Sequence, residues 1–439
     1  GKYTLQTKSF NIEDFSLKLI DDTLLKGNIN IPNIFKSKLE VNLSLNNLTR
    51  ENTHKLWPII IPKDDRIKRW VLKHIKSFNI DNSNILMKFN DNHLTDIAAK
   101  FDFRDATILY DRYFPTIYDA SGVAYFDKES MKIDVEKANV LNSKIKNSKI
   151  IIADFKQKNT PLQIKGQIIG RAEDLLKHVS YQSDFAKNIG NYINGYSNSY
   201  IDLFIPIKAK IELSNIYLQI YSTIKNINNN YVSKNSNLKV KLSKKINDDT
   251  FISSINLTES DINFKPLSIF KKKNINSYLS FNLQSNSNLL EFTDLKFILN
   301  KDKFLTGSFI FNLKQKNLQD IKLTHPDFAL SYSSDHAELS QKLTLKGKKL
   351  DLNKLQSILK SNNNRKYQNN DIEIILDKLI LANNIELNDV DVNLNCSQSL
   401  CINSFIEMKK GDKEIVNIDF KPYPIKKITK ITGKISDIS

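Results

Sequence analysis

The chain has 439 residues, of which 40% are hydrophobic and 26% are charged. This is enough apolar side chain to bury a core, so we expect a folded chain rather than a disordered one. The formal net charge of +17 comes almost entirely from lysine, and Lys, Ile and Asn are used heavily along the whole chain, as an AT-rich genome would produce. Arginine is rare in the sequence. Its planar guanidinium group makes the paired hydrogen bonds that recognise guanine and phosphate, so the composition disfavours sequence-specific binding to nucleic acid.

The sequence contains no run of about 18 consecutive apolar residues, the length that a membrane-spanning helix requires. It starts at Gly1 rather than at a methionine. A signal or anchor helix upstream of Gly1 is therefore compatible with this sequence.

Alternation of apolar and polar residues begins in the N-terminal part, at Leu39, Val41, Leu43 and Leu45. A period of two is typical of strands with one buried face. Helical patterns are few and short. One helix is predicted after Asp64 and Asp65, which can cap it, with one face formed by Ile67, Trp70, Val71, His74 and Ile75. A second is predicted from Ala172, Leu175, Leu176 and Val179.

The clearest strand pattern lies at residues 201–213. Its polar phase includes Asp202, Lys208, Lys210 and Glu212, and its apolar phase consists of Ile201, Leu203, Ile205, Ile207, Ala209, Ile211 and Leu213. Such a run at about 3.3 Å per residue would span roughly 43 Å. The usual strand has only about five or six residues, so this pattern predicts a broad sheet.

Similar alternation recurs near residues 238–242, 279–283, 309–313 and 390–394. The breaks between these runs are rich in Asn, Ser, Lys and Asp, which favour turns. A third short helix is predicted from Leu355, Ile358 and Leu359. The whole pattern predicts a mainly β protein with a broad sheet, built from serial hairpins with a few short helices.

Cys396 and Cys401 flank four residues between two strand-like runs, as expected at the tip of a hairpin. Across an antiparallel pair the Cβ atoms approach within disulfide range, and such a bond persists only in an oxidising compartment such as the periplasm. The sequence leaves open whether the disulfide forms. A metal site is disfavoured, because no His or second Cys pair lies at ligand spacing.

Motifs of catalysis are missing from the sequence. Its six histidines form no HExxH or HxH group, there is no GxSxG elbow, and no phosphate loop or GxGxxG follows a strand. Most carboxylates lie on the polar phase of strands, where solvation explains them. We therefore expect a protein that is not an enzyme and that uses no cofactor or metal. The remaining alternative is an enzyme whose site assembles only in three dimensions.

The apolar phase of the long strands has two interpretations. It is either an ordinary core covered by a second sheet, which periodicity alone favours, or the wall of a trough that a curved sheet leaves partly open. In a trough, each methylene moved out of water gains about 0.8 kcal/mol, so an acyl chain would be held easily. The residues that we expect to bind lipid are Ile201, Leu203, Ile205, Ile207, Ile211 and Leu213.

An ordered set of short segments runs from residue 56 to residue 180. It consists of Leu56-Trp57-Pro58, residues 66–71, residues 79–86, residues 101–107 with Tyr110, Phe114-Pro115, Ala120-Ser121-Gly122 and residues 170–176. In order and spacing this set resembles the AsmA-like superfamily, specifically the large YhdP-type proteins related to TamB. Residues 345–353 are similar to the short G-x-x-L-D-L element that introduces the C-terminal AsmA-like part.

The resemblance implies an elongated, curved antiparallel sheet that forms a β-groove. The groove would shield phospholipid tails between the inner and outer membranes and support outer-membrane lipid homeostasis. The resemblance also implies a periplasmic location in a Gram-negative cell, with an N-terminal helix anchored in the inner membrane, and it brings no catalytic residues. It divides the chain into N-terminal strands (1–55), a YhdP-type segment with short helices (56–180), a central groove of long strands (181–345) and an AsmA-like C-terminal part (346–439).

A different class of function stays open. In this alternative the sheet is a structural scaffold of the envelope, and its Lys-rich face contacts anionic lipid headgroups or a partner protein that the sequence does not identify. Such binding would weaken as salt rises, because exposed charges are screened within about 10 Å at roughly 0.1 M salt. Apolar lipid loading would be nearly insensitive to salt.

Overall fold

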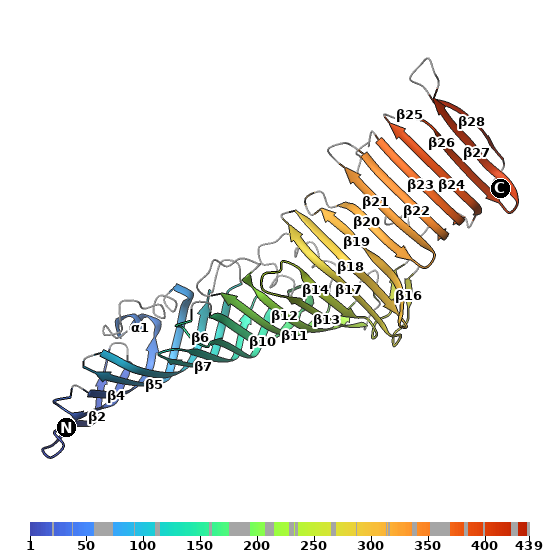
Figure 1. Cartoon of the computed structure of the whole chain (residues 1–439). Helices are drawn as coiled ribbons and strands as arrows, with labels where there is room; N and C mark the ends of the chain where they lie inside the picture. The colour runs from blue at the N-terminus through green and yellow to red at the C-terminus, as the bar shows by residue number, and fades with distance from the viewer. Residues whose placement is uncertain are drawn as a thin grey trace. The chain divides into compact units, whose positions relative to one another are not determined.

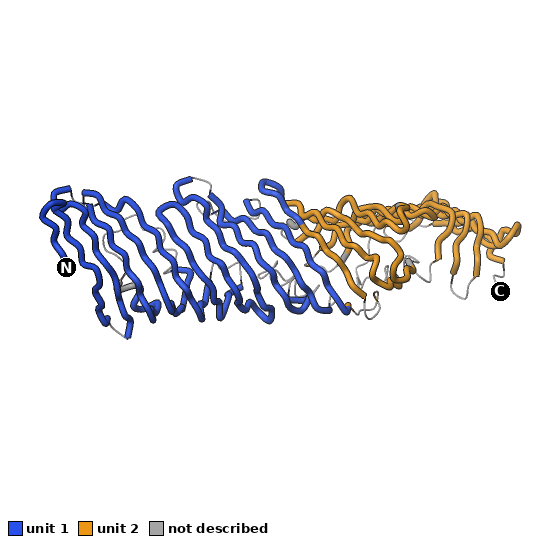
Figure 2. Tube along the Cα trace, turned by 90° about the horizontal axis from the view of Figure 1, so that it is seen from below, with its two compact units in different colours: residues 1–226, 243–248 blue, residues 227–242, 249–439 orange. Residues whose placement is uncertain are grey.

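The computed structural model places most of the chain in β-strands (Figure 1). The described residues form two compact units: unit 1 contains residues 1–226 and 243–248, and unit 2 contains residues 227–242 and 249–439 (Figure 2). The structure describes the whole chain except residues 20–21, 37, 57–72, 92, 110–114, 158–159, 175–193, 207–214, 228–231, 233–235, 265–268, 287, 313, 315–316, 336–339, 352–368, 382–384, 398–399, 423–428 and 437–439.

Unit 1 is an antiparallel sheet in which each strand pairs with the next one along the chain. A short helix, α1 (Arg50–Leu56), lies between β4 and β5 in the sequence. The strands are β1 (Lys2–Thr4), β2 (Ser9–Lys18), β3 (Leu24–Asn33), β4 (Lys38–Thr49), β5 (Ile75–Asn90), β6 (His93–Ile108), β7 (Ile117–Asp127), β8 (Met131–Val140), β9 (Ser143–Ile152), β10 (Pro161–Arg171), β11 (Tyr196–Pro206) and β12 (Tyr217–Ile227).

Unit 2 continues the pattern of sequential pairing from β17 to β24, with β14 paired to β17 and β26, β27 and β28 following β24. A separate hairpin is formed by β15 and β16. The strands are β13 (Ser236–Lys244, mostly in unit 2), β14 (Phe251–Asn256), β15 (Ile262–Phe264), β16 (Ile269–Lys271), β17 (Ser277–Asn286), β18 (Leu289–Leu299), β19 (Asp302–Asn312), β20 (Asn317–His325), β21 (Phe328–Asp335), β22 (Ser340–Asp351), β23 (Asn369–Ile380), β24 (Glu386–Ser397), β25 (Leu400–Cys401), β26 (Ser404–Lys410), β27 (Lys413–Pro422) and β28 (Thr429–Ile435).

The expected mainly β fold of curved antiparallel hairpins is confirmed, with one exception. Strands β22 and β23 run parallel, with Lys342 opposite Asp371 and Leu343 opposite Ile372. A parallel pair cannot be joined by a tight turn and needs a longer crossover. The sequence pattern did not reveal this exception, because alternation is the same in parallel and antiparallel strands.

The strand predicted at residues 201–213 is observed as β11, which starts at Tyr196 and ends at Pro206. Most of each predicted helix, at residues 64–72, 175–179 and 355–359, lies outside the described residues. Ile75, predicted on the face of the first helix, instead begins β5, because its backbone pairs with Ile108 of β6.

In several strands the alternation of inward and outward side chains is interrupted once by an extra residue. An Asn or Asp with a positive φ lies at each of these positions. In β18, Phe292 and Leu295 pair with residues on one face of β19, and Asp294 between them has a φ of 50°. A regular strand would turn the third residue to the opposite face, so a β-bulge is needed to restore the phase. Equivalent positive-φ residues in β6, β7, β9 and β24 are Asp105, Asp119, Asn147 and Asp389.

Carboxylates at these bulges accept hydrogen bonds from a neighbouring strand. Asn282 Nδ2 of β17 donates to Asp294 Oδ2 at 2.8 Å. Asn139 Nδ2 of β8 donates to Asp119 Oδ2 at 3.0 Å. Asn and Asp also tolerate the left-handed conformation better than other residues with a side chain. The bulges are therefore stabilised both by backbone preference and by a side-chain hydrogen bond.

We expect Asp294→Ala to lower the free energy of unfolding by about 1–2 kcal/mol, because alanine is strained at positive φ. Asp294→Gly should remain closer to the wild type, since glycine adopts this conformation readily. Chemical denaturation measures both changes. Glu291→Ala, at an exposed position of the same strand, is the control and should alter stability by no more than about 0.5 kcal/mol. Equal losses for the alanine and glycine variants would show that the backbone conformation is not the cause.

Candidate functional site

Apolar side chains form a continuous row across unit 1. Every second residue of a strand faces the same side of a sheet, and paired residues on neighbouring strands share that side. From β6 to β12, one row consists of Phe101, Ala124, Ile133, Ile150, Ile164, Leu203 and Leu218. We call the side that carries this row the apolar face of unit 1. Much of the face is buried in one hydrophobic cluster.

Three of the six residues predicted to bind lipid lie on this face, in β11. Ile205 is 0% exposed, whereas Ile201 and Leu203 are partly buried. Ile205 is therefore a core residue, and the other two lie where the face is less completely covered. The remaining residues of the prediction, which lie outside the described part of the chain, are Ile207, Ile211 and Leu213.

A strip of small residues crosses the same face of unit 1. Ser199 Oγ of β11 donates to Ser222 Oγ of β12 at 2.8 Å, and both side chains are buried. Ser197 Oγ donates to the carbonyl oxygen of Gly170 at 3.1 Å. A Cβ on Gly170 would come within 2.2 Å of Ser143 Oγ, so no larger residue fits without movement. The strip was not predicted, although Ser197 and Ser199 continue the apolar phase of β11 in the sequence.

Unit 2 has an apolar face of the same kind. From β19 to β24, one row consists of Phe309, Ile321, Tyr332, Leu343, Ile372 and Leu394. The row continues across the parallel pair, because the register of β22 and β23 places the apolar residue of one strand opposite an apolar residue of the other. At one end the ring of Phe309 stacks on that of Phe292, with centroids 4.3 Å apart. The side that carries this row is the apolar face of unit 2.

Part of each apolar face is open to solvent. In unit 1, Leu17 of β2 is 52% exposed and pairs with Leu25 of β3, which packs against the core cluster. In unit 2, Ile431 and Ile435 of β28 are 64% and 66% exposed. Ile435 lies opposite Val416, which belongs to the core cluster of its unit. The apolar phase therefore continues from a buried core to side chains that a ligand can reach.

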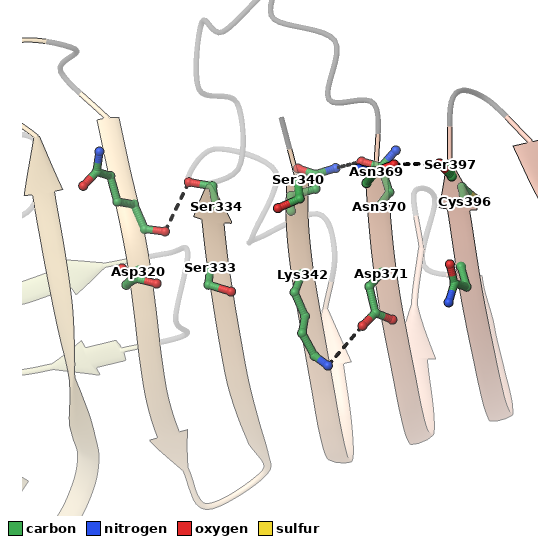
Figure 3. A pocket seen from close by; sticks show the side chains of 13 residues that line it. Asp320, Ser333, Ser334, Ser340, Lys342, Asn369, Asn370, Asp371, Cys396 and Ser397 are labelled. Atoms are coloured by element: carbon green, nitrogen blue, oxygen red, sulfur yellow. Dashed lines mark hydrogen bonds and ion pairs between the residues drawn. The ribbon is translucent and has the colours of Figure 1, made fainter. Parts of the chain in front are cut away.

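A polar pocket of about 760 Å³ lies at the ends of strands β20 to β24 in unit 2 (Figure 3). Lys342 Nζ and Asp371 Oδ2 form an ion pair of 3.0 Å within it. Cys396 also lines the pocket and is joined by a disulfide to Cys401, its partner across the pair of β24 and β25. The pocket is lined by Gln319, Asp320, Ser333, Ser334, Ser340, Gln341, Lys342, Asn369, Asn370, Asp371, Asn395, Cys396 and Ser397.

A buried histidine lies at the opposite end of β20. The side chain of His325 is 7% exposed, and its ring stacks on Phe328 and meets Phe304 edge-on, with centroids 4.9 and 4.7 Å away. The backbone N–H of Asp327 donates to Nδ1 at 3.1 Å, so the neutral ring carries its proton on Nε2. Burial lowers the pKa of His325, and the nearby Asp327 carboxylate opposes this effect only in part.

We expect His325 to make the stability of the protein depend on pH. Because its pKa is lower in the folded protein, the unfolded chain binds the proton more tightly, and stability falls as pH drops below about 6.5. His325→Phe should flatten this dependence between about pH 7 and pH 5, measured as the midpoint of urea unfolding at each pH. His93→Phe, at an exposed position, is the control and should keep the dependence. An unchanged slope in the His325 variant would contradict the assignment.

Among the described residues, His, Cys, Asp and Glu side chains form no group of three or more that could hold a metal ion. No helix in the described part of the chain is long and apolar enough to cross a membrane.

The fold and its two faces define the class of protein. It is a β protein in which serial hairpins form sheets with one apolar and one polar side. The family model described as YhdP protein matches residues 57–294, more than half of the chain. The chain belongs to the YhdP family, which is a family of cell-envelope proteins of the AsmA-like group, and the resemblance found in the sequence is thereby confirmed. No curated protein and no solved structure matches the chain significantly.

Proposed function

We propose that the protein binds phospholipid by its acyl chains on the apolar faces of its two units, and that it passes lipid between the inner and outer membranes. The observation that carries this proposal is the unbroken apolar row across neighbouring strands, which extends to exposed side chains such as Ile431 and Ile435. Ten methylenes buried on such a face would gain about 8 kcal/mol before the cost of ordering the chain. This is sufficient to hold a lipid out of water.

We further propose that the protein works in the periplasm, anchored to the inner membrane, and contributes to lipid homeostasis of the outer membrane. Membership of an envelope family supports the location. The disulfide between Cys396 and Cys401 also supports it, because such bonds persist in oxidising compartments. The proposed role needs no catalytic residue, cofactor or metal, since moving a lipid breaks no covalent bond.

The test uses exposed residues of the apolar face, because a charge at the fully buried Ile205 would unfold the protein whatever its function. We expect the double change Ile431→Asp and Ile435→Asp to lower phospholipid loading by about half, since an acyl chain on the apolar face of unit 2 would have to lie against two charges while the apolar face of unit 1 is unchanged. Native mass spectrometry and solvent extraction of protein purified from envelope extract measure the loading. Thr432→Asp, exposed on the opposite side of the same strand, is the matched control.

Loading that the control also loses would point to a damaged strand rather than to a lipid face, and circular dichroism would show this directly. A wild-type protein that carries no phospholipid would contradict the proposal. Loading that the double change leaves intact would show that Ile431 and Ile435 do not belong to the lipid-binding part of the apolar face of unit 2.

A second candidate function rests on lysines that gather on the polar face of unit 1. Lys137 of β8 lies directly opposite Lys146 of β9, and the exposed Lys144 and Lys149 lie on the same strand as Lys146. Like charges directly opposite each other destabilise a sheet. An anionic partner would relieve the repulsion between these lysines. We propose that anionic lipid headgroups are that partner. In this case the sheet acts as a scaffold of the envelope.

We expect Lys146→Glu to weaken binding to phosphatidylglycerol vesicles while slightly stabilising the fold, because the new carboxylate would face Lys137. Co-sedimentation with vesicles measures binding, which should also fall steeply as salt rises. Lys348→Glu removes the same charge from an exposed position of unit 2 and should have a smaller effect. Salt-insensitive binding, or equal effects of the two changes, would exclude this candidate.

A further inference from the structure

Aromatic side chains gather on the polar face of unit 1, the side of the sheet opposite its apolar face. Tyr200 of β11 lies directly opposite Tyr221 of β12, and Phe204 lies opposite Tyr217. Because these residues alternate with Leu203 and its partner in the apolar row, all four share the polar face. Tyr200 and Tyr221 are 45% and 43% exposed. We call these four residues the aromatic platform.

Polar groups lie between the two aromatic pairs of the platform. Asp202 and Gln219 are opposite each other there. Gln219 Nε2 donates a hydrogen bond to Tyr221 Oη at 2.6 Å, and Tyr217 Oη donates one to Gln219 Oε1 at 3.1 Å. Asp202 Oδ1 accepts a hydrogen bond from Gln163 Nε2 at 3.2 Å. These bonds hold the side chains in place, so little conformational freedom is lost when a ligand covers them.

Lysines border the platform on the same side of the sheet. Lys146 of β9 lies two strands away from Tyr200 in the same row of paired residues. In the row of Asp202, the neighbouring strands contribute Lys165 and Lys149. Strands of a sheet are about 4.8 Å apart, so the backbone of Lys146 lies roughly 10 Å from that of Tyr200. One ligand could therefore meet ring faces, hydrogen-bonding groups and positive charge together.

The ligand that fits this surface is a sugar chain that carries carboxylates. A pyranose ring has a flat face of C–H groups that packs on an aromatic ring. Its hydroxyl and amide substituents lie at the edge of the ring, where they can reach Asp202 and Gln219. The carboxylates would pair with the bordering lysines. The headgroup of a glycerophospholipid has no such flat apolar face and would leave the exposed rings of Tyr200 and Tyr221 without a partner.

We propose that the aromatic platform binds peptidoglycan, the cell-wall polymer of N-acetylated sugars whose peptide branches carry free carboxylates. The sugar rings lie on Tyr200 and Tyr221, their hydroxyl and N-acetyl groups bond to Asp202 and Gln219, and the branch carboxylates pair with the bordering lysines. Membership of a cell-envelope family supports this partner. Such binding is separate from lipid binding on the apolar faces, because it uses the opposite side of the strands, and it would hold the protein in the cell wall.

The test mixes the full chain with purified, insoluble peptidoglycan and measures the bound fraction by sedimentation. We expect the double change Tyr200→Ala and Tyr221→Ala to weaken binding by about tenfold, since two stacking contacts are lost. Tyr200→Phe with Tyr221→Phe keeps both ring faces and should bind more tightly than the alanine variant. Soluble oligomers of N-acetylglucosamine should displace the wild type from peptidoglycan, a measurement that needs no variant.

The matched control, Tyr118→Ala with Tyr278→Ala, removes two exposed tyrosines outside the platform and should leave binding unchanged. A wild type that does not sediment, a lack of displacement by the sugar oligomers, or equal losses in the platform and control variants would overturn the proposed site. An equal loss of binding to phosphatidylglycerol vesicles in the platform variant would also overturn it, because the rings would then face a membrane. Phospholipid loading should stay unchanged in every variant, so the peptidoglycan site and the lipid-binding function can fail separately.

Discussion

The structure depends on one constraint, which is that strand pairing holds a single phase of alternation on one face of each sheet. Shifting the register of a strand by one residue would turn all of its apolar side chains to the opposite face. Where the sequence itself breaks the alternation, as between Phe292 and Leu295, a bulge with a left-handed Asp294 restores the phase. The apolar rows are thus a product of pairing and of bulges together.

This constraint gives each unit two faces that can act independently. The apolar face gains free energy in proportion to the area that a ligand covers, and it is nearly indifferent to ionic strength. The polar face responds to charge and is screened by salt. The lipid-carrying and scaffold functions therefore use different sides of the same strands. A substitution on one side leaves the side chains of the other side in place.

The parallel pair of β22 and β23 departs from this repeating pattern and brings polar residues of two strands together. In a chain of hairpins, the start of one strand lies beside the end of the next. The parallel pair instead places the starts of two strands side by side, so Gln341 faces Asn370 and Lys342 faces Asp371. Both segments are polar, and both line the pocket at the ends of β20 to β24. The disulfide of Cys396 lies beside it on β24.

Local pattern was sufficient to predict the mainly β class, the serial hairpins and the apolar phase of β11, because a period of two is a property of neighbouring residues. The pair of Cys396 and Cys401 was also recognisable as a hairpin tip for the same reason. The bulges left a readable signal, an Asn or Asp between two residues of one face spaced three apart, as at Asp389 between Leu387 and Val390.

Other features were decided only by tertiary structure. Alternation does not distinguish a covered residue from an open one, so Ile205 and Ile431 read alike in the sequence although one is fully buried and the other is 64% exposed. Nor does it reveal which strands pair in parallel, or that Asp320 shares a pocket with Asn370. The sequence by itself determined which side chains share a face. The long-range register of the strands decided what each face covers and which distant polar residues meet at the strand ends, because pairing energy depends on the partner strand and not on local pattern.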